Sequence, residues 1–170
     1  MSSEFVSLSD SGEDTILMCD PCSYSANEEK AEFIRFVKEP LNYGSKKEVK
    51  TVGITSIDQL SEYFKLGKEN FLKTMVYISG DKPIFVTLSG DLEVNETKLR
   101  NYLGGEPRLA TDDELKKLKL SAGYLSPIDN EIETLLDISV DTNYDYIAGE
   151  NNPNFHFTGV VPKKDFTKII

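Results

Sequence analysis

Two apolar runs separated by a tight turn constrain the fold of this chain most strongly. Residues 71–79 and 82–89 are rich in the β-branched and aromatic side chains that favour strands. The Gly80-Asp81 pair between them suits a two-residue turn, in which glycine adopts a positive φ without strain. We therefore predict a β-hairpin at the centre of a sheet.

Three segments carry the start signals of helices. Ser56 and Thr111 are each followed three residues later by Gln or Glu, the spacing of a capping box. Asn95 is a third capping residue, and the helix after it is expected to end at the glycine pair 104–105. In each segment the apolar residues recur at helical spacing, so each helix is expected to bury one face.

Shorter patterns fill the rest of the chain. We predict a hairpin from residues 4–8 and 15–19, a helix from Asn27 to about Val37, a linker at 38–50, and strands at 134–140, 144–147 and 155–161. Strands and helices mix without a regular β–α–β alternation, which indicates an α+β fold with a mixed, strongly twisted sheet and helices outside it.

The length and the amino-terminal residues limit the class of protein. A chain of 170 residues supports one sizeable core, so one domain with appended arms is expected. No apolar run approaches the roughly eighteen residues that span a bilayer, so no membrane association is expected. Residues 1–5 lack the basic region and apolar stretch of a secretory signal, which favours a cytoplasmic location.

The charge balance argues against a broad polyanion-binding surface. The chain has 19 Lys and Arg against 29 Asp and Glu, a formal charge of −10, which repels a phosphate backbone. Any contact with nucleic acid is therefore expected to be local. The lysines at 46, 47 and 50 are either such a contact or ordinary solvated surface.

Cys19 and Cys22 form a Cys-x-x-Cys pair around Pro21. A zinc site needs about four ligands, and the chain offers no other Cys and a single His, His156. Two reduced thiols in a turn are therefore the favoured interpretation, and no metal is expected.

A loop at residues 123–127, Gly-Tyr-Leu-Ser-Pro, is the candidate functional centre. Gly123 lets another group approach the main chain, and Pro127 fixes its own φ and extends Ser126. Backbone amides of such a loop can hold a carbonyl oxygen. The bare pattern is also typical of a simple turn, so its interpretation depends on the accompanying residues.

Two further residues allow alternative interpretations from their type alone. Lys73 lies in an apolar strand, where an ammonium group faces either a cleft or, at a sheet edge, the solvent. His156 between two phenylalanines is either a packed strand residue or part of a site. Asp137 among Leu135, Leu136 and Ile138 is expected to be a buried carboxylate that requires hydrogen-bond donors.

Several local patterns occur together in one order along the chain. They are Thr51-Val52-Gly53, Lys73-Thr74, residues 90–99, the loop 123–127, Asp137, and Gly149-Glu150-Asn151 followed by His156. This combination resembles the insertion (editing) domain of bacterial prolyl-tRNA synthetase and the related free-standing YbaK-like deacylases. The resemblance implies their fold, a barrel-like twisted sheet surrounded by helices.

The resemblance extends into the flanking segments. Residues 1–40 resemble the synthetase segment that leads into the insertion, residues 45–160 the editing (deacylase) domain, and residues 161–170 the return segment. The arginine-bearing motifs of class II aminoacylation are absent from the sequence, so ligase activity is not expected from this chain. Editing requires no cofactor, whereas a parent synthetase would use ATP and Mg²⁺.

The family's task follows from a limit on selectivity. A synthetic site shaped for proline cannot strongly exclude the smaller alanine, because one or two methylenes change the discrimination by only about 1–3 kcal/mol. A second site that admits alanine and excludes the pyrrolidine ring then hydrolyses the mistake. The resemblance implies water attack on the ester of alanyl-tRNA(Pro), assisted by the substrate's own ribose hydroxyl. The expected partners are the alanine-bearing tRNA acceptor end and the remainder of the synthetase.

The resemblance also assigns residues to the site. The catalytic set that it implies is Lys73, Gly123, Ser126, Pro127 and His156. The substrate-binding set is Thr74, Tyr124, Leu125, Asp137, Gly149 and Asn151. Lys73 is expected to hold the phosphate or ribose of the terminal adenosine, and His156 to set the size of the pocket.

The sequence departs from the family pattern at three positions: Ser126 and Ser89 replace common Gly and Arg residues, and Glu150 stands where relatives have Ala. A carboxylate at residue 150 would attract the substrate's ammonium group or repel its terminal nucleotide. Two alternatives to the editing domain therefore stay open. One is a module that binds the tRNA end without hydrolysis, and the other is a free-standing deacylase that acts in trans.

Overall fold

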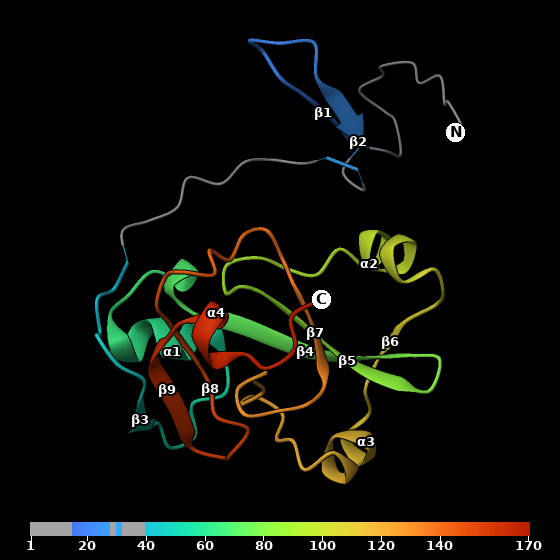
Figure 1. The fold of residues 1–170 in the computed structure, drawn as a ribbon. Helices are drawn as coiled ribbons and strands as arrows, with labels where there is room; N and C mark the ends of the chain where they lie inside the picture. Colours follow the sequence, from blue (N-terminus) through green and yellow to red (C-terminus); the bar gives the residue numbers. More distant parts are fainter. Residues whose placement is uncertain (1–14, 28–29, 32–39) are drawn as a thin grey trace. The chain divides into compact units, whose positions relative to one another are not determined.

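The predicted hairpin forms the centre of the computed structural model, which describes residues 15–27, 30–31 and 40–170. Strands β4 (Leu72–Ser79) and β5 (Lys82–Ser89) pair antiparallel over their full length. The turn glycine, Gly80, has a φ of 59°. The prediction of a central hairpin is therefore confirmed (Figure 1).

Two short strands extend this hairpin into a four-stranded sheet of order β6-β4-β5-β7. β7 (Glu133–Leu136) runs parallel to β5, whereas β6 (Arg108–Leu109) is antiparallel to β4 and pairs with it only at Tyr77 and Ile78. The sheet is therefore mixed, as predicted. Within the described residues, the half of β4 that carries Lys73 has no strand partner on the β6 side.

A second, three-stranded sheet has the order β3-β9-β8 and is antiparallel throughout. Its strands are β3 (Lys47–Lys50), β8 (Tyr146–Gly149) and β9 (Phe155–Val160). The prediction that 38–50 is entirely linker is wrong at β3, where exposed Lys and Glu residues flank the half-buried Val49. A bridge from Phe71 to Ile147 joins the two sheets.

The helices begin where the capping residues predict. They are α1 (Ile57–Phe64), α2 (Glu96–Leu103), α3 (Asp112–Lys117) and α4 (Pro162–Asp165), with a 3₁₀ turn, η1, at Lys68–Asn70. Ser56 and Thr111 both form the predicted capping boxes. Gly104 ends α2 in the left-handed conformation, with a φ of 68°. These agreements confirm the α+β class.

The hydrophobic core lies between these two sheets and the helices that cover them. Phe71, Ile147 and Val160 are fully buried, and Phe71 and Ile147 pack with Leu60 of α1. In the described residues the strands do not close into a barrel, because they divide into separate sheets. The barrel-like arrangement is therefore not confirmed.

The strand predicted at 134–140 is shorter than expected. β7 ends at Leu136, and the main chain then turns, with the Val140 N–H donating to the Asp137 carbonyl at 3.0 Å. Asp137 is exposed and Ile138 is 86% exposed. The expectation of a buried Asp137 carboxylate is therefore wrong.

The chain divides into two units between residues 34 and 35. In the smaller unit, β1 (Ile16–Met18) pairs antiparallel with β2 (Ser25–Asn27). The predicted strand at 15–19 is thus confirmed in part. Its predicted partner at 4–8 and most of the helix predicted after Asn27 lie outside the described residues.

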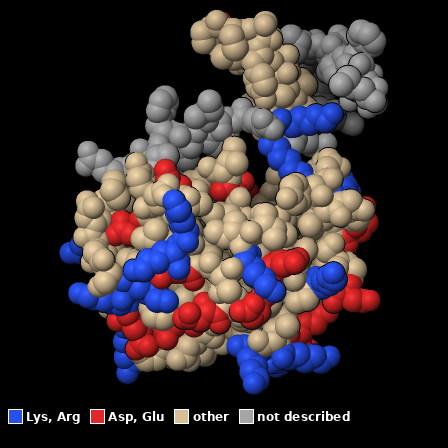
Figure 2. Space-filling model, viewed as in Figure 1, with Lys and Arg blue, Asp and Glu red and all other residues tan. Residues whose placement is uncertain are grey.

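Figure 2 shows one face of the molecule, on which acidic side chains gather mainly in the lower half of the larger unit, with Lys and Arg among and around them. None of the helices in the described ranges has the length and apolar character that a membrane crossing requires.

Candidate functional site

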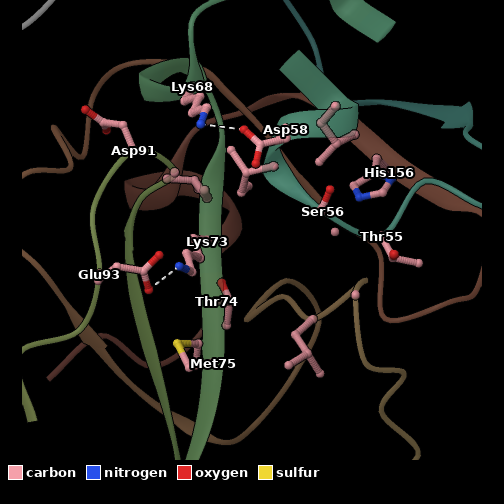
Figure 3. Close-up of a pocket in the computed structure, with 17 residues that line it drawn as sticks. Thr55, Ser56, Asp58, Lys68, Lys73, Thr74, Met75, Asp91, Glu93 and His156 are labelled. Carbon is pink, nitrogen blue, oxygen red and sulfur yellow. Dashed lines mark ion pairs between the residues drawn. The ribbon is translucent and has the colours of Figure 1, made fainter. Parts of the chain in front are cut away.

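One cavity of about 450 Å³ brings together segments that are far apart in the sequence. Its wall includes the start of α1, the turn η1, the half of β4 that β6 does not cover, the loop 123–127 and the adjoining ends of β8 and β9. Six of the residues assigned to the site from the sequence line it: Lys73, Thr74, Gly123, Leu125, Gly149 and His156. Figure 3 shows several of these side chains at the cavity.

Lys73 lies on the wall formed by β4, with its side chain 23% exposed. Its Nζ is 2.5 Å from Oε2 of Glu93 and donates to the Leu92 carbonyl at 3.5 Å. The strand is an edge at this point, yet the ammonium group lies at the cavity instead of in bulk solvent. Lys73 therefore places a cation where an anionic or polar ligand would bind.

Close packing fixes the backbone of the loop 123–127. Gly123 has a φ of 83°, and a Cβ there would lie 2.7 Å from Cβ of Thr55. A Cβ on Gly149 would lie 2.2 Å from the Tyr124 carbonyl oxygen. Both positions require glycine, since any side chain would displace the loop from the cavity wall.

Asn151 fixes the same loop through its own hydrogen bonds. Its Nδ2 donates to the Ser126 carbonyl at 2.8 Å, its Oδ1 accepts from the Ser126 N–H at 2.8 Å, and its backbone N–H donates to the Tyr124 carbonyl at 2.7 Å. The Ser126 amide is thus occupied. Within the described residues, the N–H groups of Gly123 and Leu125 have no acceptor, and both residues line the cavity.

His156 is 1% exposed and forms part of the cavity wall. Its Nδ1 lies 2.6 Å from Oγ1 of Thr51, and its ring packs against that of Tyr124 at a centroid distance of 5.2 Å. Burial lowers the pKa of His156 to about 4. The imidazole is therefore neutral at physiological pH and presents a rigid, uncharged surface.

The other predicted site residues lie away from the wall or are engaged elsewhere. Thr74 lines the cavity, but its hydroxyl lies 2.9 Å from that of Thr87. Among the residues that do not line the cavity, Tyr124, Ser126 and Pro127 are buried behind it, Asn151 contacts the loop backbone, and exposed Asp137 caps its own turn.

The three departures from the family pattern do not alter the wall directly. Ser126, Ser89 and Glu150 are not among the residues that line the cavity, and the hydroxyl of Ser89 donates to Asp91 at 2.6 Å. Burial, followed by a hydrogen bond to Glu48 and its charge, raises the pKa of Glu150 to about 7. Glu150 therefore interacts with Glu48 and does not line the cavity.

Sequence reasoning missed part of the wall. Thr55, Asp58, Lys68 and Met75 all line the cavity, and Glu93, in the stretch 90–99 that carries the resemblance, lines it without having been assigned a role. The capping box of Ser56 indicates that a helix starts there, but not that this helix start faces Lys73. Lys68 carries no sequence signal, because one lysine in a polar turn is typical of solvated surface.

The cysteines of the smaller unit are free thiols. Hydrogen bonds from the Tyr24 backbone and then from the Cys19 thiol lower the pKa of exposed Cys22. In the ranges that the structure covers, no three His, Cys, Asp or Glu side chains are grouped so as to hold a metal ion.

Comparisons with known proteins agree with the resemblance seen in the sequence. The family model described as the aminoacyl-tRNA editing domain matches residues 51–166. The chain is 38% identical over 170 residues to a proline–tRNA ligase of Dehalococcoides mccartyi, covering 97% of this chain and 29% of the ligase. It is 37% identical over 171 residues to that of Halothermothrix orenii, covering 98% and 30%. The chain thus spans less than a third of the length of these relatives.

A solved structure shares the fold. The crystal structure of a proposed trans-editing enzyme for prolyl tRNA synthetase superposes with a TM-score of 0.62 at 19% identity, covering 72% of this chain and 80% of that one. This match supports the architecture alone. The family model covers most of the larger unit, including the whole cavity wall, and the chain therefore belongs to the aminoacyl-tRNA editing domain family.

Proposed function

We propose that this chain is the editing domain of a proline–tRNA ligase and hydrolyses the ester of alanine mischarged onto proline tRNA. One observation carries the proposal: Lys73, the loop 123–127 and His156 meet at a single cavity. The identity to proline–tRNA ligases along nearly the whole chain supports the same function.

In the proposed reaction, water adds to the ester carbonyl carbon, the bond to the ribose oxygen breaks, and that oxygen leaves with a proton. The products are free alanine and uncharged tRNA. The N–H groups of Gly123 and Leu125, two residues apart on the wall, are the donors for the developing oxyanion. Because an aminoacyl ester is already activated, positioning the water against the substrate's own ribose hydroxyl suffices, without a side-chain base.

Lys73 supplies the positive charge of the site in this proposal. Its partner Glu93 is 83% exposed, so that carboxylate can move into solvent when the ribose or phosphate of the terminal adenosine arrives. The ammonium group then faces the substrate from β4. A cation held close to the ester also favours the negative charge of the transition state.

The size filter must be local, because a cavity of about 450 Å³ holds far more than one methyl group. Neutral His156 is the proposed filter, since Thr51 and Tyr124 hold its ring rigidly at the wall. The larger part of the cavity then receives the terminal nucleotide. Alanine fits between the loop and His156, and a pyrrolidine ring does not.

The division of the chain follows from this proposal. Residues 1–40 are an arm from the synthetase catalytic region, 45–160 are the deacylase, and 161–170 are the return segment. The return segment packs on the same unit through bridges from Phe166 to Ile128 and from Ile169 to Thr134. This packing suits a segment that leads from an inserted domain back to its parent.

The proposal is tested by incubating the chain with alanyl- and prolyl-tRNA(Pro) and measuring ester loss. We expect loss of the alanyl ester above background and retention of the prolyl ester. Retained binding with no ester loss would instead support a module that binds the tRNA end. Faster loss from cysteinyl- or seryl-tRNA in a wider panel would support a deacylase that acts in trans.

A further inference from the structure

The cavity wall carries a second cation besides Lys73. Lys68, in the turn η1, lines the cavity and forms an ion pair with Asp58 of α1. A hydrogen bond to Asp58, its charge, and the charge of Asp91 raise the pKa of Lys68, so this lysine is fully charged at neutral pH. Figure 3 shows this pair and the Lys73–Glu93 pair at the same cavity.

The two lysines differ in their depth. The side chain of Lys73 is 23% exposed, whereas that of Lys68 is 49% exposed. Lys73 is therefore the more enclosed of the two lysines, and Lys68 is the more open to solvent. Of the two cations on the wall, Lys68 is thus the one more accessible to a charged group that arrives from solution.

The net negative charge of the chain makes the position of Lys68 important. The chain has a formal charge of −10, so its surface as a whole repels a polynucleotide. Lys68 and Lys73 are the only cationic side chains on the cavity wall within the described residues. In the proposed function Lys73 contacts the ribose or phosphate of the terminal adenosine. Lys68 is then the other cationic side chain on this wall that could pair with a further phosphate of the ligand.

We infer that Lys68 binds a phosphodiester of the tRNA acceptor end, exchanging Asp58 for the phosphate as the substrate enters. This inference rests on the proposed function and adds to it a phosphate subsite at Lys68. Asp58 is 75% exposed, so its carboxylate can rotate into water. In the free protein Asp58 keeps the lysine over the cavity, and with substrate present it competes with the phosphate.

The test compares two substrates that differ in their phosphates. Alanyl-adenosine carries the ester without a phosphodiester, and an alanylated acceptor-stem minihelix carries both. Lys68→Gln is expected to raise the KM for the minihelix about fivefold relative to that for alanyl-adenosine. It is also expected to reduce the slope of log binding constant against log salt concentration by about 0.7. Equal effects on both substrates would overturn the inference.

Asp58→Asn separates phosphate binding from a structural ion pair. If the pair only joins η1 to α1, Lys68→Gln and Asp58→Asn must weaken minihelix binding alike. If Lys68 binds phosphate, Asp58→Asn instead tightens minihelix binding, because the competing carboxylate is gone. Lys82 is an exposed lysine at the hairpin turn, away from the cavity wall. Lys82→Gln is therefore the charge-matched control, and it is expected to change neither minihelix binding nor the KM for the minihelix relative to that for alanyl-adenosine.

Binding of the uncharged minihelix, followed by fluorescence anisotropy, keeps this inference distinct from the proposed function. Lys68-dependent binding by a chain that hydrolyses no ester would support the phosphate subsite and contradict the hydrolase. Ester hydrolysis with binding that is indifferent to Lys68→Gln would contradict the phosphate subsite alone.

Discussion

Lys73 is the residue on which the proposed chemistry depends most. It lies on a strand whose other members are mostly apolar, and it faces a cavity at the point where β6 no longer covers β4. Lys73 forms an ion pair with Glu93, whose side chain is largely exposed to solvent. The pair therefore contributes at most about 1 kcal/mol to stability. The position therefore suits a functional role better than a structural one.

Lys73→Ala is expected to reduce deacylation of alanyl-tRNA(Pro) to the background rate while the fold stays intact. The substrate loses its cationic contact, whereas the protein loses only an exposed ion pair. Single-turnover ester loss and circular dichroism measure the two effects, with Lys82→Ala as the control for a removed lysine. A folded variant with the wild-type rate would remove Lys73 from the mechanism.

His156→Ala is expected to turn prolyl-tRNA(Pro) into a substrate. Removing the ring opens the wall next to the loop, where the pyrrolidine ring would otherwise collide. The readout is the ratio of kcat/KM for the prolyl and alanyl esters, which should rise. Thermal unfolding is followed alongside, because the lost packing against Tyr124 lowers stability. An unchanged ratio in a folded variant would place the size filter elsewhere.

At the level of strands and loops, the contact between β8 and the loop 123–127 sets the shape of the site. Gly149 ends β8 with its Cα against the Tyr124 carbonyl, and Asn151, two residues later, holds Ser126 from the same side. This close approach fixes the backbone of a loop whose Gly123 and Leu125 line the cavity.

Gly149→Ala is expected to destabilise the protein by roughly 1–3 kcal/mol and to reduce kcat for ester hydrolysis. The new methyl group would lie 2.2 Å from the Tyr124 carbonyl oxygen, so the loop must move. Gly105→Ala, which meets no atom within 4 Å and has no positive φ, is the matched control. Equal unfolding midpoints and rates for the two variants would show that the close approach does not order the loop.

A pair of carboxyl groups connects β3 with the residue that follows β8. Glu48 hydrogen-bonds to Glu150, and one carboxyl oxygen of Glu150, Oε2, is buried without a partner within the described residues. The pKa of Glu150 is raised from 4.5 to about 7, so the folded state holds this proton more tightly than the unfolded state. Stability from this group is present below pH 4.5 and is lost as the pH rises to about 7.

Glu150→Gln is therefore expected to raise the unfolding temperature at pH 8 and to change it little near pH 5. The amide removes the charge repulsion that wild-type Glu150 experiences at pH 8. Glu62→Gln, at an exposed position on α1, makes the same change in charge and is expected to shift neither midpoint. A larger rise of the unfolding temperature at pH 5 than at pH 8 would contradict the raised pKa of Glu150.

For the molecule as a whole, the sequence predicts structure wherever local signals decide it. The capping boxes at Ser56 and Thr111 and the Gly80-Asp81 turn each determine their own segment, and all three are confirmed. The prediction is wrong at β3, where a run of lysines resembles a linker, because pairing with β9 decides that segment. It is wrong at Asp137 because the flanking apolar residues do not reveal that β7 has ended.

The cavity could be predicted only in part. Residue types alone left the roles of the loop 123–127, Lys73 and His156 open, and the resemblance assigned all three to the site. Asp58 and Lys68 were missed, and Glu93 was given no role, since their position depends on how α1, η1 and the segment after β5 fold against β4. The hydrogen bonds of Asn151 with Ser126 and Tyr124 likewise join segments that are far apart in the sequence.

The central claim is that the ester binds between the loop 123–127 and His156. The most direct measurement is a titration of the ¹⁵N-labelled chain with alanine joined by an amide to 3′-amino-3′-deoxyadenosine, which resists hydrolysis. The account predicts chemical-shift changes concentrated at the amides of Gly123, Leu125 and Gly149, with Gly80 at the far end of the hairpin unchanged. Saturable shifts confined to residues outside the cavity wall would contradict it.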